Sequence, residues 1–266
     1  DIPRAEKNLR FYASAAQQYL TEAGMAAGAN QLHYVHRKPL GTVGVISPWN
    51  LPLYLFTWKV APALAMGNCV IGKPSEVTPA TAYLLSQWIN EAGFPPGSFN
   101  IVHGLGKEVG EALVTHPRIK AISFTGGTAT GQHIARAVAG TSKKTTFELG
   151  GKNPAIIFED CDFDLTLRTI VRSGFANQGQ ICLCSSRYLI HESIYERFRD
   201  ALVEKVSAMV PGDPSLPETK MGAVASADHL AKIESYVERA KELGGTILCG
   251  GTATHPEGER CSNGYF

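Results

Sequence analysis

The sequence has no large excess of charge of either sign. Its 266 residues include 25 Lys and Arg residues against 24 Asp and Glu residues, which gives a formal net charge of +1. Proteins that bind nucleic acids usually carry a strongly basic surface, and this balance argues against that class. The sequence also lacks internal repeats and low-complexity segments. We therefore expect a globular protein with no nucleic-acid partner.

Cysteine is sparse and scattered. Six cysteines in a chain of this length do not form a dense disulfide framework, and no signal-peptide pattern precedes them. We therefore expect reduced thiols and a cytoplasmic location. The closest pair, Cys182 and Cys184, has no second pair at the spacing of a zinc site, so we expect no metal.

Long apolar runs suited to a membrane are also missing. The longest uncharged stretch, residues 39–58, contains Pro39, Pro48 and Pro52. Prolines at these positions exclude a clean membrane-spanning helix, so we expect no membrane partner.

Short apolar segments alternate with segments of helical period. We predict strands at 43–46, 68–71, 99–102, 119–124, 145–149, 155–158 and 246–248. We predict helices at 4–20, 52–66, 78–91, 108–115, 164–177, 194–210 and 228–243, and a further helix that follows Gly127 and ends at Val138. Pro52 suits the first turn of its helix, and Thr78 could cap the next one. Such alternation predicts an α/β fold with a parallel sheet covered by helices.

The length and one glycine pair predict two domains. Domains of roughly 150 residues are common, and Gly150-Gly151 directly follows a predicted strand. We therefore expect a first domain over residues 1–149 and a second over residues 150–266.

Three chemically useful side chains follow predicted elements. Cys182 lies in a polar turn after a helix, Glu148 lies near the end of a strand, and Asn50 lies between two prolines after another strand. Taken singly, each has a commoner interpretation as a small buried residue, a surface charge or a turn residue. Together they supply a nucleophile, a base and an amide donor. We expect all three at the carboxyl ends of strands, where α/β sheets bind ligands.

Five spans of the sequence together resemble the NAD(P)-dependent aldehyde dehydrogenase superfamily. They are Gly44–Pro52, Lys73–Glu76, Phe124–Gly131, Phe147–Pro154 and Asn177–Arg187, in the family's order. The resemblance implies a doubly wound parallel-sheet cofactor domain and a second α/β catalytic domain. It also implies that this chain is truncated at both ends, so we expect it to be inactive by itself.

The resemblance assigns the chemistry. Cys182 would attack an aldehyde as a thiolate, giving a thiohemiacetal and then a thioester. The amide of Asn50 and the backbone N–H of Cys182 would stabilise the oxyanion, and Glu148 would activate water. Cys184 is the less suitable nucleophile because the family motif aligns with Cys182.

The resemblance also implies an NAD site, although the sequence has no G-x-G-x-x-G motif. Glycines would admit the pyrophosphate at a helix start, Lys73 and Glu76 would hold the adenosine ribose, and Glu76 would favour NAD over NADP. Gly127 departs from a frequent serine of the family. The implied cofactor residues are Ser47, Pro48, Trp49, Asn50, Lys73, Ser75, Glu76, Gly106, Gly110, Gly126, Gly127, Gly131, Leu149 and Gly150.

The substrate is less defined. The start of the sequence, the Ile-Cys-Leu-Cys segment and the motif that begins at Glu148 look most like the 2-aminomuconic and 2-hydroxymuconic semialdehyde dehydrogenases. Arg4 would then bind a substrate carboxylate, although it could equally be structural. Arg187 has the same two interpretations, and the structural one is favoured. The alternatives are a broader enzyme for betaine, aliphatic or retinal aldehydes, and a crystallin-like structural protein. The family resemblance implies a homodimer or homotetramer.

Overall fold

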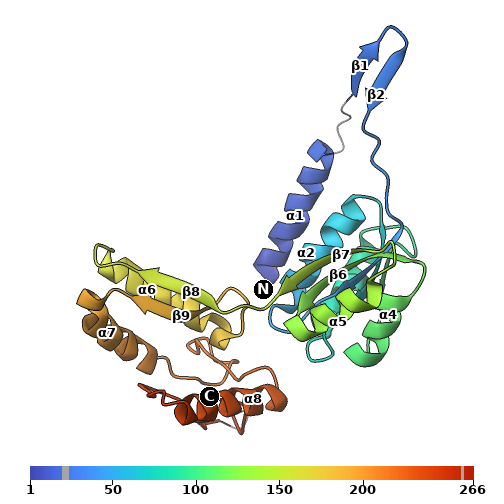
Figure 1. Cartoon of the computed structure of the whole chain (residues 1–266). Coiled ribbons are helices and arrows are strands. Elements are labelled where there is room, and N and C mark those ends of the chain that lie inside the picture. Colours follow the sequence, from blue (N-terminus) through green and yellow to red (C-terminus); the bar gives the residue numbers. More distant parts are fainter. Residues whose placement is uncertain (20–23, 259–260) are drawn as a thin grey trace. The chain divides into compact units, whose positions relative to one another are not determined.

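The computed structural model describes residues 1–19, 24–258 and 261–266 (Figure 1). The chain divides into two compact units, Asp1–Leu149 and Gly150–Phe266, and each is described here by itself. The division falls at the glycine pair where the sequence predicts a domain boundary.

The first unit is built on a five-stranded parallel sheet with the order β5-β4-β3-β6-β7. These strands are β3 (Thr42–Ile46), β4 (Cys69–Lys73), β5 (Phe99–Ile101), β6 (Ile119–Gly126) and β7 (Lys144–Leu149). Ile46 at the end of β3 pairs with Lys73 on one side and with Phe124 on the other. The predicted α/β fold with a parallel sheet is confirmed.

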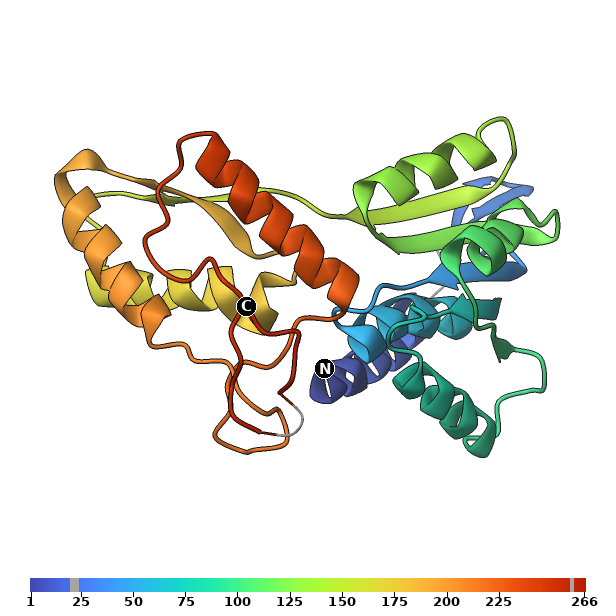
Figure 2. The same ribbon diagram turned by 90° about the horizontal axis from the view of Figure 1, so that it is seen from below.

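One face of this sheet is covered by α2 (Pro52–Ala65) and α3 (Ala80–Glu91), and α1 (Ile2–Tyr19) packs against α2 (Figure 2). The apolar sides of these helices pack on Val45 and Val70, and Phe56 and Val60 of α2 are fully buried there. Burial of this apolar surface is the main favourable term that holds the helices on the sheet. The predicted cap of α3 is wrong, because Pro79 precedes the helix and the Thr78 hydroxyl donates to the carbonyl of Trp49 instead.

The other face is covered by a π-helical turn, η1 (Gly106–Gly110), and by α4 (Glu111–Thr115) and α5 (Thr128–Val138). Ile122 and Phe124 of β6 form a second apolar cluster with Leu113, Ile134 and Val138. Because both faces are covered, the central strands are apolar on both sides, as their sequences indicate.

An antiparallel hairpin, β1 (Gly24–Gly28) and β2 (Gln31–Tyr34), lies between α1 and β3, where the sequence pattern predicts no strand. Its large side chains, Met25, Leu32 and Tyr34, are exposed. Short segments without an alternating apolar face give little sequence signal, which is why the pattern missed them.

The second unit contains a parallel pair, β8 (Asn153–Ile157) and β9 (Ser185–Ile190), joined through α6 (Phe163–Phe175) and the 3-10 turn η2 (Ala176–Gly179). The turn η3 (Glu192–Ile194) and α7 (Tyr195–Ser207) follow, and Phe198 of α7 is fully buried against Ile157, Leu167 and Ile170. The last helix is α8 (Ala227–Glu242). Residues 246–248 are irregular and not a strand, because no neighbouring strand pairs with them in the described chain.

In the described residues, no helix combines the length and hydropathy needed to span a membrane. Within the same ranges, no group of three or more His, Cys, Asp or Glu side chains could hold a metal ion.

Candidate functional site

The carboxyl edge of the parallel sheet in the first unit collects most of the predicted cofactor residues. Parallel strands present this edge on one side, and each predicted group follows or ends a different strand. The residues at this edge or in the turns beside it are Ser47, Pro48, Trp49, Asn50, Lys73, Ser75, Glu76, Gly106, Gly110, Gly126, Gly127, Gly131, Glu148 and Leu149. Gly150 is the first residue of the second unit.

The end of β3 is held to the end of β4. The N–H of Ser47 donates to the carbonyl of Lys73 at 3.2 Å. The Ser47 hydroxyl is buried, as is the hydroxyl of Thr125 on β6, and neither has a hydrogen-bond partner in the described part of the chain. Burying an unpaired polar group costs free energy. Two such hydroxyls at one edge fit a site that a polar ligand completes.

The end of β4 carries a lysine that is engaged on two sides. The ammonium nitrogen of Lys73 lies 3.0 Å from Oε2 of Glu76 and 3.1 Å from the carbonyl oxygen of Pro74. Burial alone would raise the pKa of Glu76, but hydrogen bonds to its backbone and to Lys73, with the charge of Lys73, lower it overall. The Oγ of Ser75 accepts from the N–H of Val77 at 3.2 Å. The lysine and carboxylate thus form a fixed polar pair.

The end of β6 leads into the N-terminus of α5. Gly127 precedes the helix, and a methyl group placed on it would meet nothing within 4 Å. Inside the helix, a methyl group on Gly131 would lie 2.6 Å from Cδ2 of Leu149, so only glycine lets α5 approach β7 this closely. Open space at a helix N-terminus suits an anion, because its N–H groups point outward.

These features fit a dinucleotide. The open helix start suits a pyrophosphate, and the Lys73–Glu76 pair suits ribose hydroxyls. The π-helical turn η1 approaches the same lysine, since a methyl group on Gly110 would lie 3.8 Å from Cδ of Lys73. The missing serine at Gly127 removes one hydroxyl that could contact phosphate, but leaves the backbone donors in place.

Sequence reasoning missed Lys59, which lies on the same sheet face as Glu148. Only 6% of Lys59 is exposed, and its ammonium nitrogen lies 3.4 Å from Oγ of Ser123. Burial lowers the pKa of Lys59 to about 8, while the nearby charge of Glu148 acts in the opposite direction. The sequence signal that could have identified Lys59 is its charge within a helix whose other residues are mostly apolar.

Arg4 lies beside the first turn of α2. Its guanidinium carbon is 3.7 Å from the centre of the Tyr54 ring. The carboxylate of Asp1 accepts from the N–H groups of Leu53 and Tyr54 at 3.0 Å each, so it serves as the cap that α2 lacks in its own sequence. The residue before α1 is thereby bound to Leu53 and Tyr54, three and four residues past Asn50.

Cys182 lies in the second unit, in the turn between η2 and β9. The expectation that it follows the carboxyl end of a strand is wrong, because the turn precedes β9 and therefore lies at the amino end of that strand. The reason is connectivity, since the chain returns from α6 to begin β9. Asn177 and Gln178 in η2 have φ angles of 52° and 55°, in the left-handed region.

The turn that carries Cys182 is held by hydrogen bonds. The N–H of Cys184 donates to the carbonyl of Ile181 at 3.0 Å. The side-chain nitrogen of Asn153 donates to the carbonyls of Cys182 at 2.6 Å and Cys184 at 3.1 Å.

Arg187 donates to the carbonyl of Lys152 at 2.8 Å, which supports the structural interpretation of this arginine.

Cys184 of this turn has a raised pKa. Burial of the Cys184 thiol raises its pKa, and the neighbouring Cys182 raises it further. A hydrogen bond with the backbone of Ile181 lowers the pKa of Cys184, but the net change is an increase. The Sγ of Cys184 also lies 3.7 Å from the carbonyl oxygen of Ala176, toward which its S–H points. Cys184 therefore carries less thiolate at neutral pH than an ordinary cysteine.

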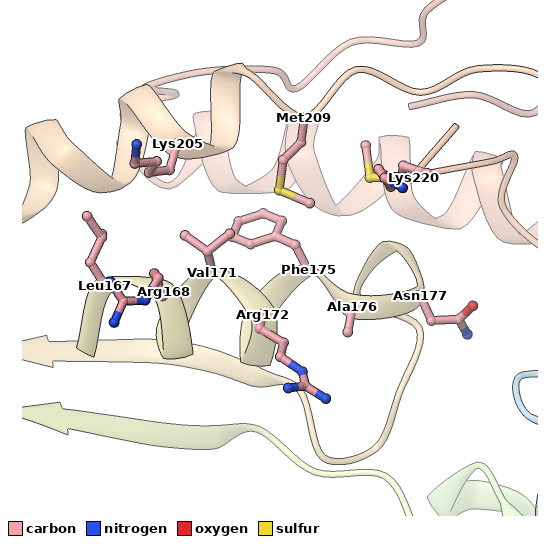
Figure 3. A pocket seen from close by; sticks show the side chains of 11 residues that line it. Leu167, Arg168, Val171, Arg172, Phe175, Ala176, Asn177, Lys205, Met209 and Lys220 are labelled. Carbon is pink, nitrogen blue, oxygen red and sulfur yellow. The ribbon is translucent and has the colours of Figure 1, made fainter. Parts of the chain in front are cut away.

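A cavity of about 330 Å³ lies on the side of α6 that faces the end of α7 (Figure 3). Val171 and Phe175 of α6 point toward Met209 across it. Asn177 is among the residues that line this space, whereas Cys182 and Cys184 are not. The cavity is therefore separate from the thiol turn.

Comparison with known proteins identifies the family. Residues 1–266 match the model described as the aldehyde dehydrogenase family. The chain is 50% identical over 250 residues to human 2-aminomuconic semialdehyde dehydrogenase, covering 94% of this chain and 51% of that protein. It is 44% identical over 255 residues to 2-hydroxymuconic semialdehyde dehydrogenase of Pseudomonas sp. strain CF600, covering 94% and 52%.

The fold agrees with this match. A crystal structure of betaine aldehyde dehydrogenase from Staphylococcus aureus in complex with NAD+ superposes with a TM-score of 0.92 at 36% identity, covering 97% of this chain and 51% of that chain. The chain spans about half the length of the curated relatives it matches. The match over the whole chain means that this protein belongs to the aldehyde dehydrogenase family.

Proposed function

We propose that this protein oxidises an aldehyde to a carboxylic acid with NAD, and that Cys182 carries the covalent step. The observation that carries the proposal is the carboxyl edge of the first unit, where the residues of four family motifs follow neighbouring strands. Family membership supports the reaction class, and the open N-terminus of α5 supports a phosphate-bearing cofactor.

The first chemical step belongs to Cys182. Its thiolate attacks the carbonyl carbon, a C–S bond forms, and the carbonyl oxygen takes the negative charge. The amide of Asn50 and the N–H of Cys182 donate to this oxyanion, and losing one such donor typically costs ~3 kcal/mol of transition-state stabilisation. The raised pKa of Cys184 supports Cys182 as the nucleophile of the pair.

The cofactor residues bind and orient. Lys73 and Glu76 would hold the adenosine ribose, and the backbone at Gly126 and Gly127 would hold the pyrophosphate. The carboxylate of Glu76 accepts from a free 2′-hydroxyl and repels a 2′-phosphate, which favours NAD over NADP. When bound, NAD supplies the hydride acceptor that the oxidation requires.

Glu148 acts in the hydrolytic step. Its carboxylate takes a proton from water, the water oxygen attacks the thioester carbon, and the C–S bond breaks to release the acid and the Cys182 thiolate. Glu148 is exposed in the first unit and interacts with the charge of Lys59.

We infer a semialdehyde with a distal carboxylate as the substrate, as in the muconic semialdehyde dehydrogenases. Arg4 supplies a cation stacked on the Tyr54 ring, and the Tyr54 ring centre lies 5.8 Å from that of Trp58. A guanidinium stacked on a ring still presents its N–H groups in plane to a carboxylate. The same cation would repel the quaternary ammonium group of betaine aldehyde. We further propose a cytoplasmic homodimer or homotetramer.

The test is NADH formation by the protein at its natural length. We would compare 2-hydroxymuconic semialdehyde, betaine aldehyde and an aliphatic aldehyde, with Cys182→Ala as the control. The proposal expects preference for the dicarboxylic substrate and no turnover in the variant. Equal rates on all three would remove the substrate proposal. Bound NAD without turnover would favour a crystallin-like structural protein.

A further inference from the structure

We propose that Asn153 is a positioning residue that fixes the backbone on which Cys182 is carried. The proposal rests on the proposed function, because it concerns the same nucleophile. Asn153 begins β8, and its side-chain nitrogen donates to the carbonyl oxygens of Cys182 and Cys184 at 2.6 Å and 3.1 Å. An amide group has two hydrogens on this nitrogen, and both are used.

The two peptide groups that flank Cys182 are both held. The carbonyl of Ile181 accepts from the N–H of Cys184 at 3.0 Å, and the carbonyl of Cys182 accepts from Asn153. Because a peptide group is planar, fixing the Ile181 carbonyl also sets the direction of the Cys182 N–H. Fixing both flanking peptides sets the direction of the Cα–Cβ bond that carries the thiol.

This backbone needs an external partner because regular structure does not hold it. Cys182 lies outside any helix or strand, and two residues shortly before it adopt left-handed φ angles. The β8–β9 ladder is itself irregular between Asn153 and Pro154. A side-chain donor at the start of β8 therefore replaces the hydrogen bonds that a ladder would supply.

The role requires a donor and not merely the shape of asparagine. An ionised aspartate has the same shape but only accepts hydrogen bonds, so it would face two carbonyl oxygens with no proton to share. Glutamine is one methylene longer but keeps both donor hydrogens. If Asn153 acts as a hydrogen-bond donor, kcat should therefore be higher for Asn153→Gln than for Asn153→Asp. If Asn153 acts only through its shape, kcat should be higher for Asn153→Asp.

The test combines amide hydrogen exchange with steady-state kinetics on the protein at its natural length. In Asn153→Ala and Asn153→Asp, we expect the peptide that spans residues 181–185 to exchange ~10-fold faster, with exchange in the first unit unchanged. We expect kcat to fall ~10- to 100-fold while KM for NAD stays within ~2-fold, because misplacing a reactive group affects the chemical step. Asn153→Gln should retain more kcat than Asn153→Asp.

Asn68→Ala is the matched control. The side-chain nitrogen of Asn68 donates to the carbonyl of Ala63 at 3.1 Å, and its oxygen accepts from the N–H of Leu40 at 2.7 Å, so it also bridges backbone segments. It lies before β4, at the edge of the sheet opposite the cofactor residues. This variant should change neither exchange at 181–185 nor kcat.

Three results would overturn the proposal. The first is unchanged hydrogen exchange at residues 181–185 in both Asn153→Ala and Asn153→Asp. The second is faster exchange there with an unchanged kcat. The third is a higher kcat for Asn153→Asp than for Asn153→Gln. If Asn153→Ala fails to fold, the ranking of the Asp and Gln variants still decides. The exchange measurement needs neither NAD nor aldehyde, so a failure of the proposed function would be seen separately, as absent NADH formation in the unaltered protein.

Discussion

The ammonium nitrogen of Lys73 and the carboxylate oxygen Oε2 of Glu76 lie 3.0 Å apart at the end of β4, with the Lys73 side chain buried and that of Glu76 45% exposed. The buried cation holds the carboxylate in place while leaving one side of it open. If this carboxylate selects NAD, Glu76→Gln should narrow the preference for NAD over NADP by ~10-fold, because the repulsion of a 2′-phosphate is removed.

The measurement is kcat/KM with each cofactor. The control is Glu91→Gln at the end of α3, a carboxylate distant in sequence from the ribose-binding candidates. An unchanged cofactor preference in Glu76→Gln would show that this carboxylate does not contact the ribose.

Arg4 should determine the response to substrate charge. Arg4→Ala should raise KM for a dicarboxylic semialdehyde by ~10- to 100-fold, because a charge-assisted hydrogen bond contributes ~1.5–3 kcal/mol. KM for a neutral aliphatic aldehyde should change little. Arg10→Ala is the control, since Arg10 is also on α1 but pairs with Glu6 at 2.8 Å on the exposed side. Equal losses on both substrates in Arg4→Ala would assign Arg4 to the structure of α1 and α2.

The buried amine of Lys59 should make the free energy of unfolding increase with pH above about pH 8. Its pKa is about 8 in the folded protein against an ordinary value of 10.5, so between these values the unfolded chain binds the proton that the folded chain has lost. The free energy of unfolding should therefore increase from about pH 8 to about pH 10.5, by up to about 3 kcal/mol from this group.

Denaturant unfolding across that range, in unaltered protein and in Lys59→Met, measures the effect. The variant should lose this rise, and Lys144→Met at an exposed position of β7 should retain it. An identical pH profile in Lys59→Met would contradict the account of Lys59 as a buried amine.

Gly72 should tolerate no side chain. A methyl group on this residue of β4 would lie 2.4 Å from Cζ of Phe56, whose ring is fully buried. Gly72→Ala should therefore destabilise the protein by about 1–3 kcal/mol, the usual effect of overpacking a core. Thermal unfolding measures it, with Gly127→Ala as the control because that position has open space. Equal melting temperatures for the two variants would contradict the packing described.

The sequence was sufficient for features with a local signal. Apolar segments alternating with helical ones predict the parallel sheet, and Pro52 marks the start of α2. The strand ends then place the family motifs at one edge of the first unit. Periodicity and turn chemistry act over a few residues, so a sequence pattern can detect them.

Other features depend on contacts between distant residues. The carboxylate of Asp1 caps α2, and the side chain of Asn153 binds the carbonyl of Cys182, 29 residues along the chain. No sequence pattern near Asp1 or Asn153 predicts these hydrogen bonds. The placement of Cys182 at the amino end of β9 follows from the path of the chain after α6. Such relationships appear only when the fold is assembled, because they need side-chain geometry in addition to residue order.

The covalent role of Cys182 is the central claim, and trapping the acyl-enzyme tests it most directly. Glu148→Gln should slow hydrolysis of the thioester, so protein at its natural length that is mixed with NAD and a semialdehyde and then acid-quenched should gain the mass of one acyl group. Peptide mass spectrometry should place that group on Cys182, and Cys182→Ala should abolish it. An acyl group on Cys184, or a variant that turns over freely with no trapped mass, would contradict the account.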